Sequence, residues 1–290
     1  MSEDPPTRRT LELVRELSDP GVDPASPPTS LADLGFDSLA FAELALALEE
    51  ELGLDLGRAI LDGMGTVNDV LEAVARAGPA RGWIDVPAEV GRLQGAAGVI
   101  GGRPLGWWLD LEVVGAEHVP EHGAAILPMN HESALDIPIA VIACPRRVTF
   151  MAKEELFKNG VASWSLERLG GFHVDRERFD LQALRLALAV IRRGEVLGMY
   201  PEGTRSPGEL LPFLHGAAWV AARTGAPLVP VALRGTERAG HAKLPRRVHV
   251  RAIFGEPLPV EPVEGRTERR RRVAELTAEL RAAIETGLRA

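Results

Sequence analysis

The chain has 290 residues, of which 46% are hydrophobic and 26% charged, and its net charge is −8. This composition is ordinary for a folded globular protein, and the length predicts one or two domains. Residues 1–78 contain 16 Asp/Glu and 5 Lys/Arg, whereas the remainder has a net charge of +3. The asymmetry indicates an acidic module followed by a mildly basic one, and it excludes nucleic acid as a partner of the first.

Cysteine usage and the N-terminus constrain the compartment. Cys144 is the only cysteine, which excludes an intramolecular disulfide and a cysteine-based metal site, and its apolar surroundings predict a buried thiol. The start, Met-Ser-Glu-Asp-Pro-Pro, lacks the basic and apolar segments of a signal peptide, and no apolar run reaches the length of a membrane span. We therefore expect a cytoplasmic protein, with peripheral membrane association as an open alternative.

Three helices are predicted in the first module. Thr10 to Leu17 has apolar residues at a helical period, a second helical run begins at Ser38, and Thr66 is a plausible N-cap for a last helix over Val67 to Ala77. Glu43, Glu49, Glu50 and Glu51 are expected at polar positions of the second helix. Asp37 and Ser38 are both common N-cap residues, and capping alone would explain them.

The motifs of this module resemble those of an acyl carrier protein. They are Leu34-Gly-Phe-Asp-Ser-Leu39, Glu43-Leu44, Leu48-Glu-Glu-Glu51 and Thr66-Val67, and the resemblance covers residues 8–77. It implies a four-helix bundle in which Ser38 carries covalent 4′-phosphopantetheine, whose thiol holds acyl groups as thioesters. It also implies two partners, a phosphopantetheinyl transferase and an acyl-loading enzyme. The acidic second helix independently fits docking onto basic patches of partner enzymes.

A linker separates the two modules. Gly78-Pro79-Ala-Arg-Gly82 is turn-rich, and glycine and proline stay frequent through Gly106. The predicted organisation is a carrier-like domain over residues 1–78, a linker segment over 79–106 and a second domain over 107–290. Trp107 and Trp108 are expected to pack in the core or linker, and seating in a lipid headgroup layer is the alternative.

The second module alternates strand-like and helix-like runs, which predicts an α/β domain with a mixed central sheet. The expected strands cover residues 111–114, 124–129, 148–151, 196–200, 228–233 and 248–254. The expected helices cover residues 137–143, 181–193, 217–223 and 267–288. The run Arg269–Arg272 in the last helix is read as a solvated face, with contact to anionic lipid as the alternative.

The stretch Asn130 to Asp136 follows a predicted strand and places His131 five residues before Asp136. A neutral imidazole removes a proton from a hydroxyl group, and a carboxylate on its other nitrogen fixes the tautomer. On one helix the two side chains would point about 140° apart, so they meet only if His131 lies in the turn. Pro138 favours a helix start near Leu135 or Asp136. The plain alternative is that Asp136 is an N-cap.

Two further polar clusters follow predicted strands. Gly171-Phe-His-Val-Asp-Arg176 is the first, and Glu202-Gly-Thr-Arg-Ser206 is the second. Ligands of open α/β sheets gather beyond the strand ends, and a Gly-Thr turn with an arginine suits an anion. Local ion pairs that stabilise turns are the alternative for Glu202 with Arg205 and for Arg176 with its neighbours.

Taken in order, four blocks resemble the lysophospholipid/glycerol-3-phosphate acyltransferase family of the 1-acylglycerol-3-phosphate acyltransferase type. They are Asn130-His-x-x-x-x-Asp136, Gly171-Phe-x-Val-Asp-Arg176, Tyr200-Pro-Glu-Gly-Thr-Arg-Ser206 and Ala226-Pro-Leu-Val-Pro-Val231. The resemblance spans residues 107–256. It implies that His131 is the general base and Asp136 its orienting partner. It further implies that Glu202, Gly203, Thr204 and Arg205 bind the acceptor and that Arg176 helps to hold its phosphate.

Together the two resemblances imply an O-acyltransferase of lipid metabolism, in particular phospholipid biosynthesis. It would move an acyl group from a phosphopantetheine thioester, on its own or a free carrier protein, to a hydroxylated acceptor such as glycerol-3-phosphate or lysophosphatidate. The chemistry needs no metal. Leu214-His215 stand where the family usually has a lysine, which leaves a non-glycerolipid alcohol as an alternative acceptor. A carrier domain that serves only as an unmodified docking module is the other alternative.

Overall fold

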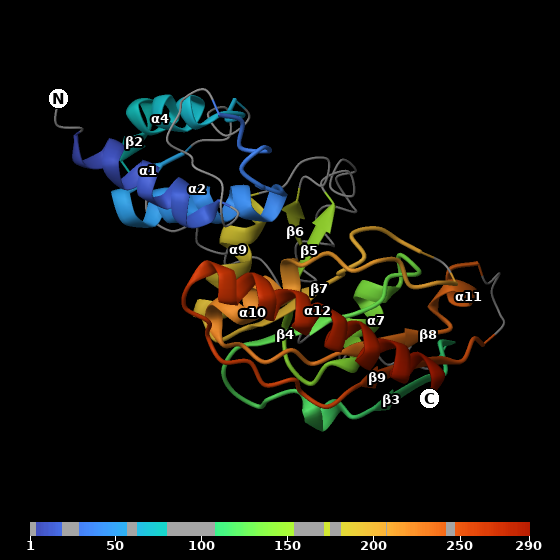
Figure 1. The fold of residues 1–290 in the computed structure, drawn as a ribbon. Coiled ribbons are helices and arrows are strands. Elements are labelled where there is room, and N and C mark those ends of the chain that lie inside the picture. The colour runs from blue at the N-terminus through green and yellow to red at the C-terminus, as the bar shows by residue number, and fades with distance from the viewer. Residues whose placement is uncertain are drawn as a thin grey trace. The chain divides into compact units, whose positions relative to one another are not determined.

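The computed structural model describes residues 4–18, 29–56, 63–79, 108–153, 171–174, 181–206, 208–241 and 247–290. The chain divides into two compact units, Met1–Trp83 and Ile84–Ala290, whose elements are shown in Figure 1. Within the described ranges, every helix is too short or too polar to traverse a bilayer.

The first unit is helical. Its described helices are α1 (Pro5–Leu17), α2 (Ser38–Leu52) and α4 (Val67–Arg76), and β1 (Leu54–Asp55) pairs antiparallel with β2 (Gly78–Pro79). α1 packs against both α2 and α4. The helices predicted from the sequence are confirmed, although α1 begins five residues earlier than expected. The fourth helix of the predicted bundle stays a prediction, because residues 57–62 lie outside the described part.

Capping residues fix the ends of these helices. Asp37 precedes α2 and its carboxylate accepts a hydrogen bond from the N–H of Ala40 at 2.7 Å. The Thr66 hydroxyl accepts from the N–H of Asp69, whose carboxylate accepts from the N–H of Thr66. This reciprocal capping box confirms Thr66 as the N-cap and lowers the pKa of Asp69 through the hydrogen bonds from Thr66 and Gly65.

The acidic face of α2 is smaller than the sequence predicts. Glu43 is buried, so its expected polar position is wrong. Glu49 accepts a hydrogen bond from the N–H of Leu56, and Glu51 pairs with Arg9 of α1. Glu50 and Glu51 remain exposed. Part of this charge therefore holds the unit together rather than facing a partner.

The second unit contains two runs of hydrogen-bonded strands. One has the order β3–β9–β8 and the other β4–β7–β5–β6. Parallel bridges join Ile126 to Leu228 and Met129 to Val231, so the chain of β8 borders that of β4. Strand pairs are parallel except β8 with β9, which confirms a mixed sheet. The bounds are β3 (Leu111–Val114), β4 (Ala125–Pro128), β5 (Val148–Lys153), β6 (Gly171–Val174), β7 (Val196–Met199), β8 (Val231–Arg234) and β9 (Val250–Phe254).

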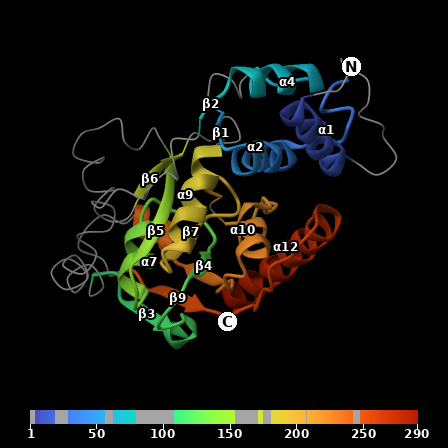
Figure 2. The ribbon, with the colours of Figure 1, turned by 90° about the vertical axis from the view of Figure 1, so that its left-hand side faces the viewer.

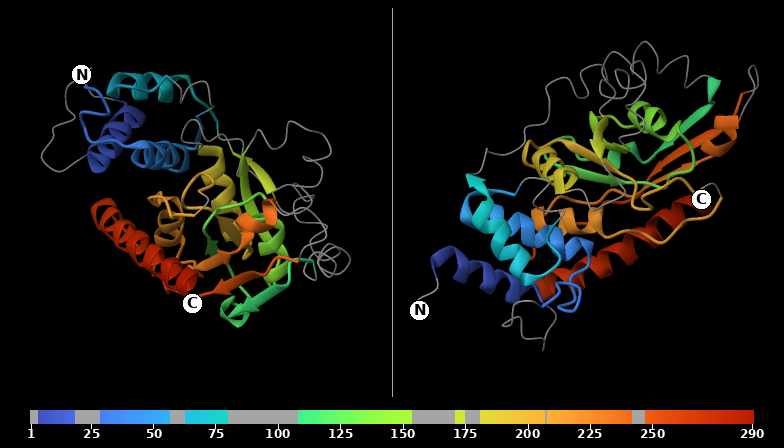
Figure 3. Two further views of the ribbon diagram at one scale, coloured as in Figure 1. Left: turned by 90° about the vertical axis from the view of Figure 1, so that its right-hand side faces the viewer. Right: turned by 90° about the horizontal axis from the view of Figure 1, so that it is seen from above.

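Helices cover both sides of these strands. Three helices lie side by side, with α10 in the middle because it contacts both of the others. They are α9 (Leu181–Arg192), α10 (Gly216–Thr224) and α12 (Arg266–Arg289). α9 packs on β5, β6 and β7, and α12 packs on β8. α7 (Asp136–Ala143) contacts β9 and lies on the other side of the strands from α10 and α12 (Figures 2 and 3). The layers form an α/β domain with helices on both faces.

Some segments approach too closely for a side chain. A Cβ on Gly198 of β7 would lie 2.3 Å from the ring of Phe150, which is fully buried. A Cβ on Gly287 of α12 would lie 2.7 Å from that of Ala232 in β8. These glycines let an aromatic ring and a helix lie directly on the sheet.

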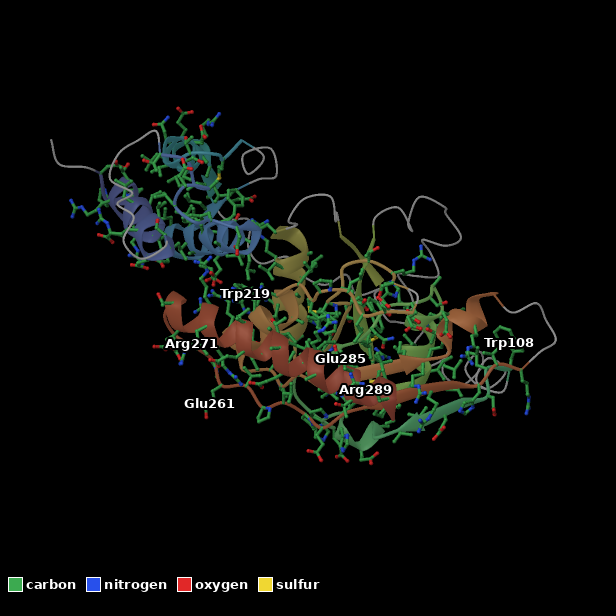
Figure 4. The ribbon with its side chains drawn as sticks, turned by 45° about the vertical axis from the view of Figure 1, so that its right-hand side comes forward. Trp108, Trp219, Glu261, Arg271, Glu285 and Arg289 are labelled. Atoms are coloured by element: carbon green, nitrogen blue, oxygen red, sulfur yellow. The ribbon has the colours of Figure 1, made fainter. Side chains whose placement is uncertain are left out.

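Two arginines of the run near the start of α12 pair with glutamates. Arg271 pairs with Glu268 and Glu275, and Arg272 pairs with Glu275 and Glu279. Figure 4 shows Arg271 near the start of α12, with Glu285 and Arg289 near its end and Trp219 on α10. These exposed pairs agree with the solvated-face interpretation of the arginine run.

Other predictions for this unit meet mixed outcomes. Cys144 is buried, as expected, and burial raises the pKa of its thiol to about 11. Trp108 packs against the core, which favours the core interpretation, whereas Trp107 lies outside the described residues. The sequence missed the 3₁₀ turn η1 (Ala116–His118), helix α11 (Thr236–His241) and strand β6, whose residues it assigned only to a polar cluster.

Candidate active site

His131 and Asp136 meet in the turn between β4 and α7. α7 begins at Asp136, so His131 lies in the turn and Pro138 falls in the first helical turn, as the spacing predicts. Nδ1 of His131 lies 2.7 Å from Oδ2 of Asp136. The helix N-terminus also favours the negative charge of this carboxylate.

Oδ2 of Asp136 accepts three hydrogen bonds. Besides the imidazole, the backbone N–H groups of Glu132 and Ser133 donate to it, each at 2.8 Å. Because a carboxylate oxygen accepts, Nδ1 of His131 carries the proton and Nε2 presents a lone pair. Leu135 occupies the N-cap position, so the alternative of Asp136 as a plain N-cap is wrong. The arrangement prepares His131 to remove a proton from a hydroxyl group.

The ring of Tyr200 fixes the plane of the imidazole. The two ring centroids lie 4.0 Å apart with an interplanar angle of 21°, and both side chains are buried. Sequence analysis placed Tyr200 in a motif without predicting this contact. A signal was present, because it is the only tyrosine and directly precedes Pro-Glu-Gly-Thr-Arg.

Glu202 connects the third block to the first. Its Oε1 accepts a hydrogen bond from the N–H of His131 at 2.9 Å. Its Oε2 accepts from the N–H of Leu211 at 2.9 Å and from the hydroxyl of Ser206. The N–H of Ser206 in turn donates to the carbonyl of His131 at 2.7 Å. The backbone of His131 is therefore held on both sides by the loop after β7.

The remaining residues of the third block form the turn beside this link. Gly203 has a positive φ of 70°, a conformation that favours glycine, and a Cβ there would meet Leu214. Thr204 and Arg205 are exposed. The structure thus joins His131, Asp136 and Glu202 by hydrogen bonds, and Gly203, Thr204 and Arg205 continue the loop directly after Glu202. Arg176 lies outside the described residues.

Asn130 ties the first block to β8. Its Nδ2 donates to the carbonyl of Leu233 at 2.9 Å, and its Oδ1 accepts from the N–H of Leu233 at 2.7 Å. The side-chain amide thereby extends the strand pairing past the end of β4. This role was also not predicted, because it depends on a strand 103 residues away.

Leu214 and His215 follow Phe213 and lead into α10. Leu214 is 62% exposed, and the imidazole of His215 lies 3.0 Å from the hydroxyl of Thr277 in α12. His215 is thus engaged with α12 by hydrogen bonding.

A histidine oriented by a buried carboxylate, at the edge of an α/β sheet, defines a site for general-base chemistry on an acceptor, as in acyl transfer. Comparison with known proteins agrees with this class. The family described as Acyltransferase matches residues 110–234, and that described as Phosphopantetheine attachment site matches residues 10–74.

The relatives are phospholipid-synthesis enzymes. The chain is 31% identical over 149 residues to the 1-acyl-sn-glycerol-3-phosphate acyltransferase of Bacillus subtilis, covering 51% of this chain and 73% of the relative. It is 30% identical over 163 residues to the human alpha enzyme of the same name, covering 55% and 57%. The crystal structure of PlsC, the 1-acyl-sn-glycerophosphate acyltransferase of Thermotoga maritima, matches with a TM-score of 0.50 and 25% identity over 84% of this chain and 96% of that one. The protein therefore belongs to the acyltransferase family, with a phosphopantetheine carrier domain preceding the catalytic one.

Proposed function

We propose that the protein transfers an acyl group from a phosphopantetheine thioester to the hydroxyl of an acceptor such as glycerol-3-phosphate or lysophosphatidate. The observation that carries the proposal is the 2.7 Å contact between Nδ1 of His131 and Oδ2 of Asp136, inside the first block of the acyltransferase family. A carrier domain in the same chain supports a pantetheine thioester as the donor.

In this mechanism His131 is the catalytic base. Its Nε2 takes the hydroxyl proton as the acceptor oxygen attacks the thioester carbonyl carbon. The carbon–sulfur bond breaks, and the imidazolium returns the proton to the sulfur, which leaves an ester and a free thiol. Asp136 stabilises the imidazolium, and Glu202 positions the backbone of His131. Thr204 and Arg205, with Arg176, are proposed to hold the acceptor.

Ser38 is the proposed attachment site of 4′-phosphopantetheine. It is the first residue of α2, a helix of 15 residues with no acidic residue in its first turn. Asp37 already caps the N–H of Ala40 at this end of the helix, and the helix macrodipole favours a further anion close to it. The group would supply the thiol that carries the acyl chain.

A second candidate acceptor is an alcohol without a phosphate. The exposed Leu214 and the engagement of His215 with Thr277 favour it, because they remove one cation from the family's acceptor side. Comparison of phosphorylated and neutral acceptors, described under the next heading, separates the two candidates.

Replacing His131 by Ala should abolish transfer. General-base catalysis contributes about 10²–10⁴-fold, so we expect a loss of about 10³-fold in kcat for the acyl-loaded protein, measured as ester formed from glycerol-3-phosphate. Asp136→Asn should lower kcat by about 10²-fold, because the imidazole loses its orientation and the stabilisation of its charge.

The matched control is His122→Ala, since His122 is exposed in the loop before β4. It should leave the rate unchanged, and all three variants should have the thermal unfolding midpoint of the unmodified sequence to within a few degrees. Turnover retained by folded His131→Ala would rule out the mechanism.

A further inference from the structure

A polar pocket borders the turn that carries His131. Its volume is about 290 Å³, just below the range of about 300–1,000 Å³ for ligand pockets. Ionisable side chains line it: Glu132, Arg234, Glu237, Arg238, His249 and Arg251. Glu132 directly follows His131, so the pocket lies beside the candidate base. Its charged lining suits a polar group and not an acyl chain.

Two arginines of the pocket wall lie next to each other on the sheet. Arg234 of β8 and Arg251 of β9 are register partners in the antiparallel pair. Directly opposite residues share a face with Cβ atoms about 5 Å apart, and like charges in this arrangement destabilise the sheet. Glu112 of β3 compensates Arg251, at 2.9 Å from its Nε. Arg234 makes no ion pair with any carboxylate in the described part of the chain. Its charge is therefore available to an anion.

The pocket wall also carries acidic side chains. Oε1 of Glu237 pairs with Arg238 at 3.2 Å, whereas its Oε2 is buried and receives no N–H or hydroxyl group from the described residues. The carboxyl group of Glu132 interacts with that of Glu237 through a side-chain hydrogen bond, which favours the protonated form of Glu132. Burial first, and then this contact and the charge of Glu237, raise the pKa of Glu132 to about 7. The wall can thus exchange hydrogen bonds with a ligand's hydroxyl group.

We propose that this pocket binds the polar head of the acceptor, with Arg234 on its anionic group and the Glu132–Glu237 pair on a neighbouring hydroxyl. The inference rests on the proposed function and narrows the acceptor to a small anionic polyol head of the glycerol phosphate type. An acyl chain on the acceptor lies outside the pocket.

The test replaces Arg234 by Gln in the full, acyl-loaded chain. Glycerol-3-phosphate and glycerol serve as acceptors, and each is varied at a fixed donor concentration. Loss of one arginine–phosphate contact should raise KM for glycerol-3-phosphate by about tenfold or more and leave kcat within about threefold. kcat/KM for glycerol should change little. Arg193→Gln is the matched control, because this arginine pairs with Glu195 on the turn after α9, outside the pocket.

Two outcomes would overturn the proposal. An equal change in kcat/KM for both acceptors in Arg234→Gln, or no change, would show that Arg234 does not bind the anionic group. A raised KM for the acyl donor alone would assign the pocket to the phosphodiester of the pantetheine arm. Calorimetric titration of glycerol-3-phosphate into the unloaded chain keeps the two proposals apart: weaker binding to Arg234→Gln supports the pocket even where no acceptor is acylated, and equal binding contradicts it.

Discussion

The carboxyl group of Glu132 is surrounded by other acids. Glu237 of α11 contacts it, Asp136 of α7 and Glu202 of the loop after β7 add negative charge, and Arg234 of β8 is the pocket's uncompensated cation. The folded protein therefore binds a proton here more tightly than the unfolded chain does. A raised pKa stabilises the fold at low pH, and this contribution is lost as the pH rises through about 7.

Glu132→Gln should remove this pH dependence. The amide keeps a hydrogen-bond donor for Glu237 and stays neutral at every pH. The free energy of unfolding of the variant, minus that of the original protein, should therefore rise by about 1 kcal/mol between pH 5 and pH 8. This value is reduced for solvent screening, because the site is half-exposed. Urea unfolding at both pH values measures it. Glu264→Gln, at an exposed position before α12, should give a profile parallel to that of the unmodified chain. A parallel profile for Glu132→Gln would contradict the raised pKa of Glu132.

Local contacts at this scale were predictable, and distant ones were not. The His131–Asp136 pair follows from a five-residue spacing and one proline. The bond from His131 to Glu202 joins residues 71 apart, and nothing in the spacing distinguishes it from a Glu202–Arg205 pair. Arg234 belongs to no sequence motif, and its proposed role depends on its position opposite Arg251 in the antiparallel pair of β8 and β9.

At the scale of elements, the packing on β7 depends on a glycine, Gly198, which leaves room for an aromatic ring. Gly198 lies beneath Phe150, whose ring is fully buried and has no room to move. Gly198→Ala should destabilise the protein by about 1–3 kcal/mol, measured by chemical unfolding, because the new methyl group overpacks the core. Phe150→Leu in the same background should recover part of the loss. An additive double variant would show that the ring is not the obstacle.

Elements with strong apolar runs were found from the sequence alone. β4 and β7 are buried along their whole length, and their continuous apolar runs are typical of inner parallel strands. β6 is four residues long and contains His173, so no alternation marks it. α11 is six residues long, too short to show a helical period, and its position becomes evident only through the pocket it lines.

At the scale of the whole molecule, a carrier domain and an acyltransferase domain are joined in one chain, and the proposed function makes the first the donor of the second. Linking raises the effective concentration of the donor to about the millimolar range when both sites engage together. Treatment with a phosphopantetheinyl transferase should add the mass of the group to the protein, and Ser38→Ala should abolish the addition. The acyl-loaded protein should then transfer at a rate per molecule that does not change on dilution.

Ser38→Ala should still acylate the acceptor when a separate loaded carrier protein is added, at a rate that rises with carrier concentration. Addition of the group to Ser38→Ala would place the attachment elsewhere. No addition to the unmodified sequence would favour a docking role for the carrier domain.

The links from Asn130 to Leu233 and from His131 to Glu202 have a consequence for biosynthesis. They join residues 103 and 71 positions apart, so the turn that holds His131 lacks these two links until the chain as far as Leu233 has left the ribosome. Domains fold as units, the N-terminal one first. The ribosome completes the carrier region some 150 residues before Leu233, so modification at Ser38, as proposed above, can precede completion of the acyltransferase domain.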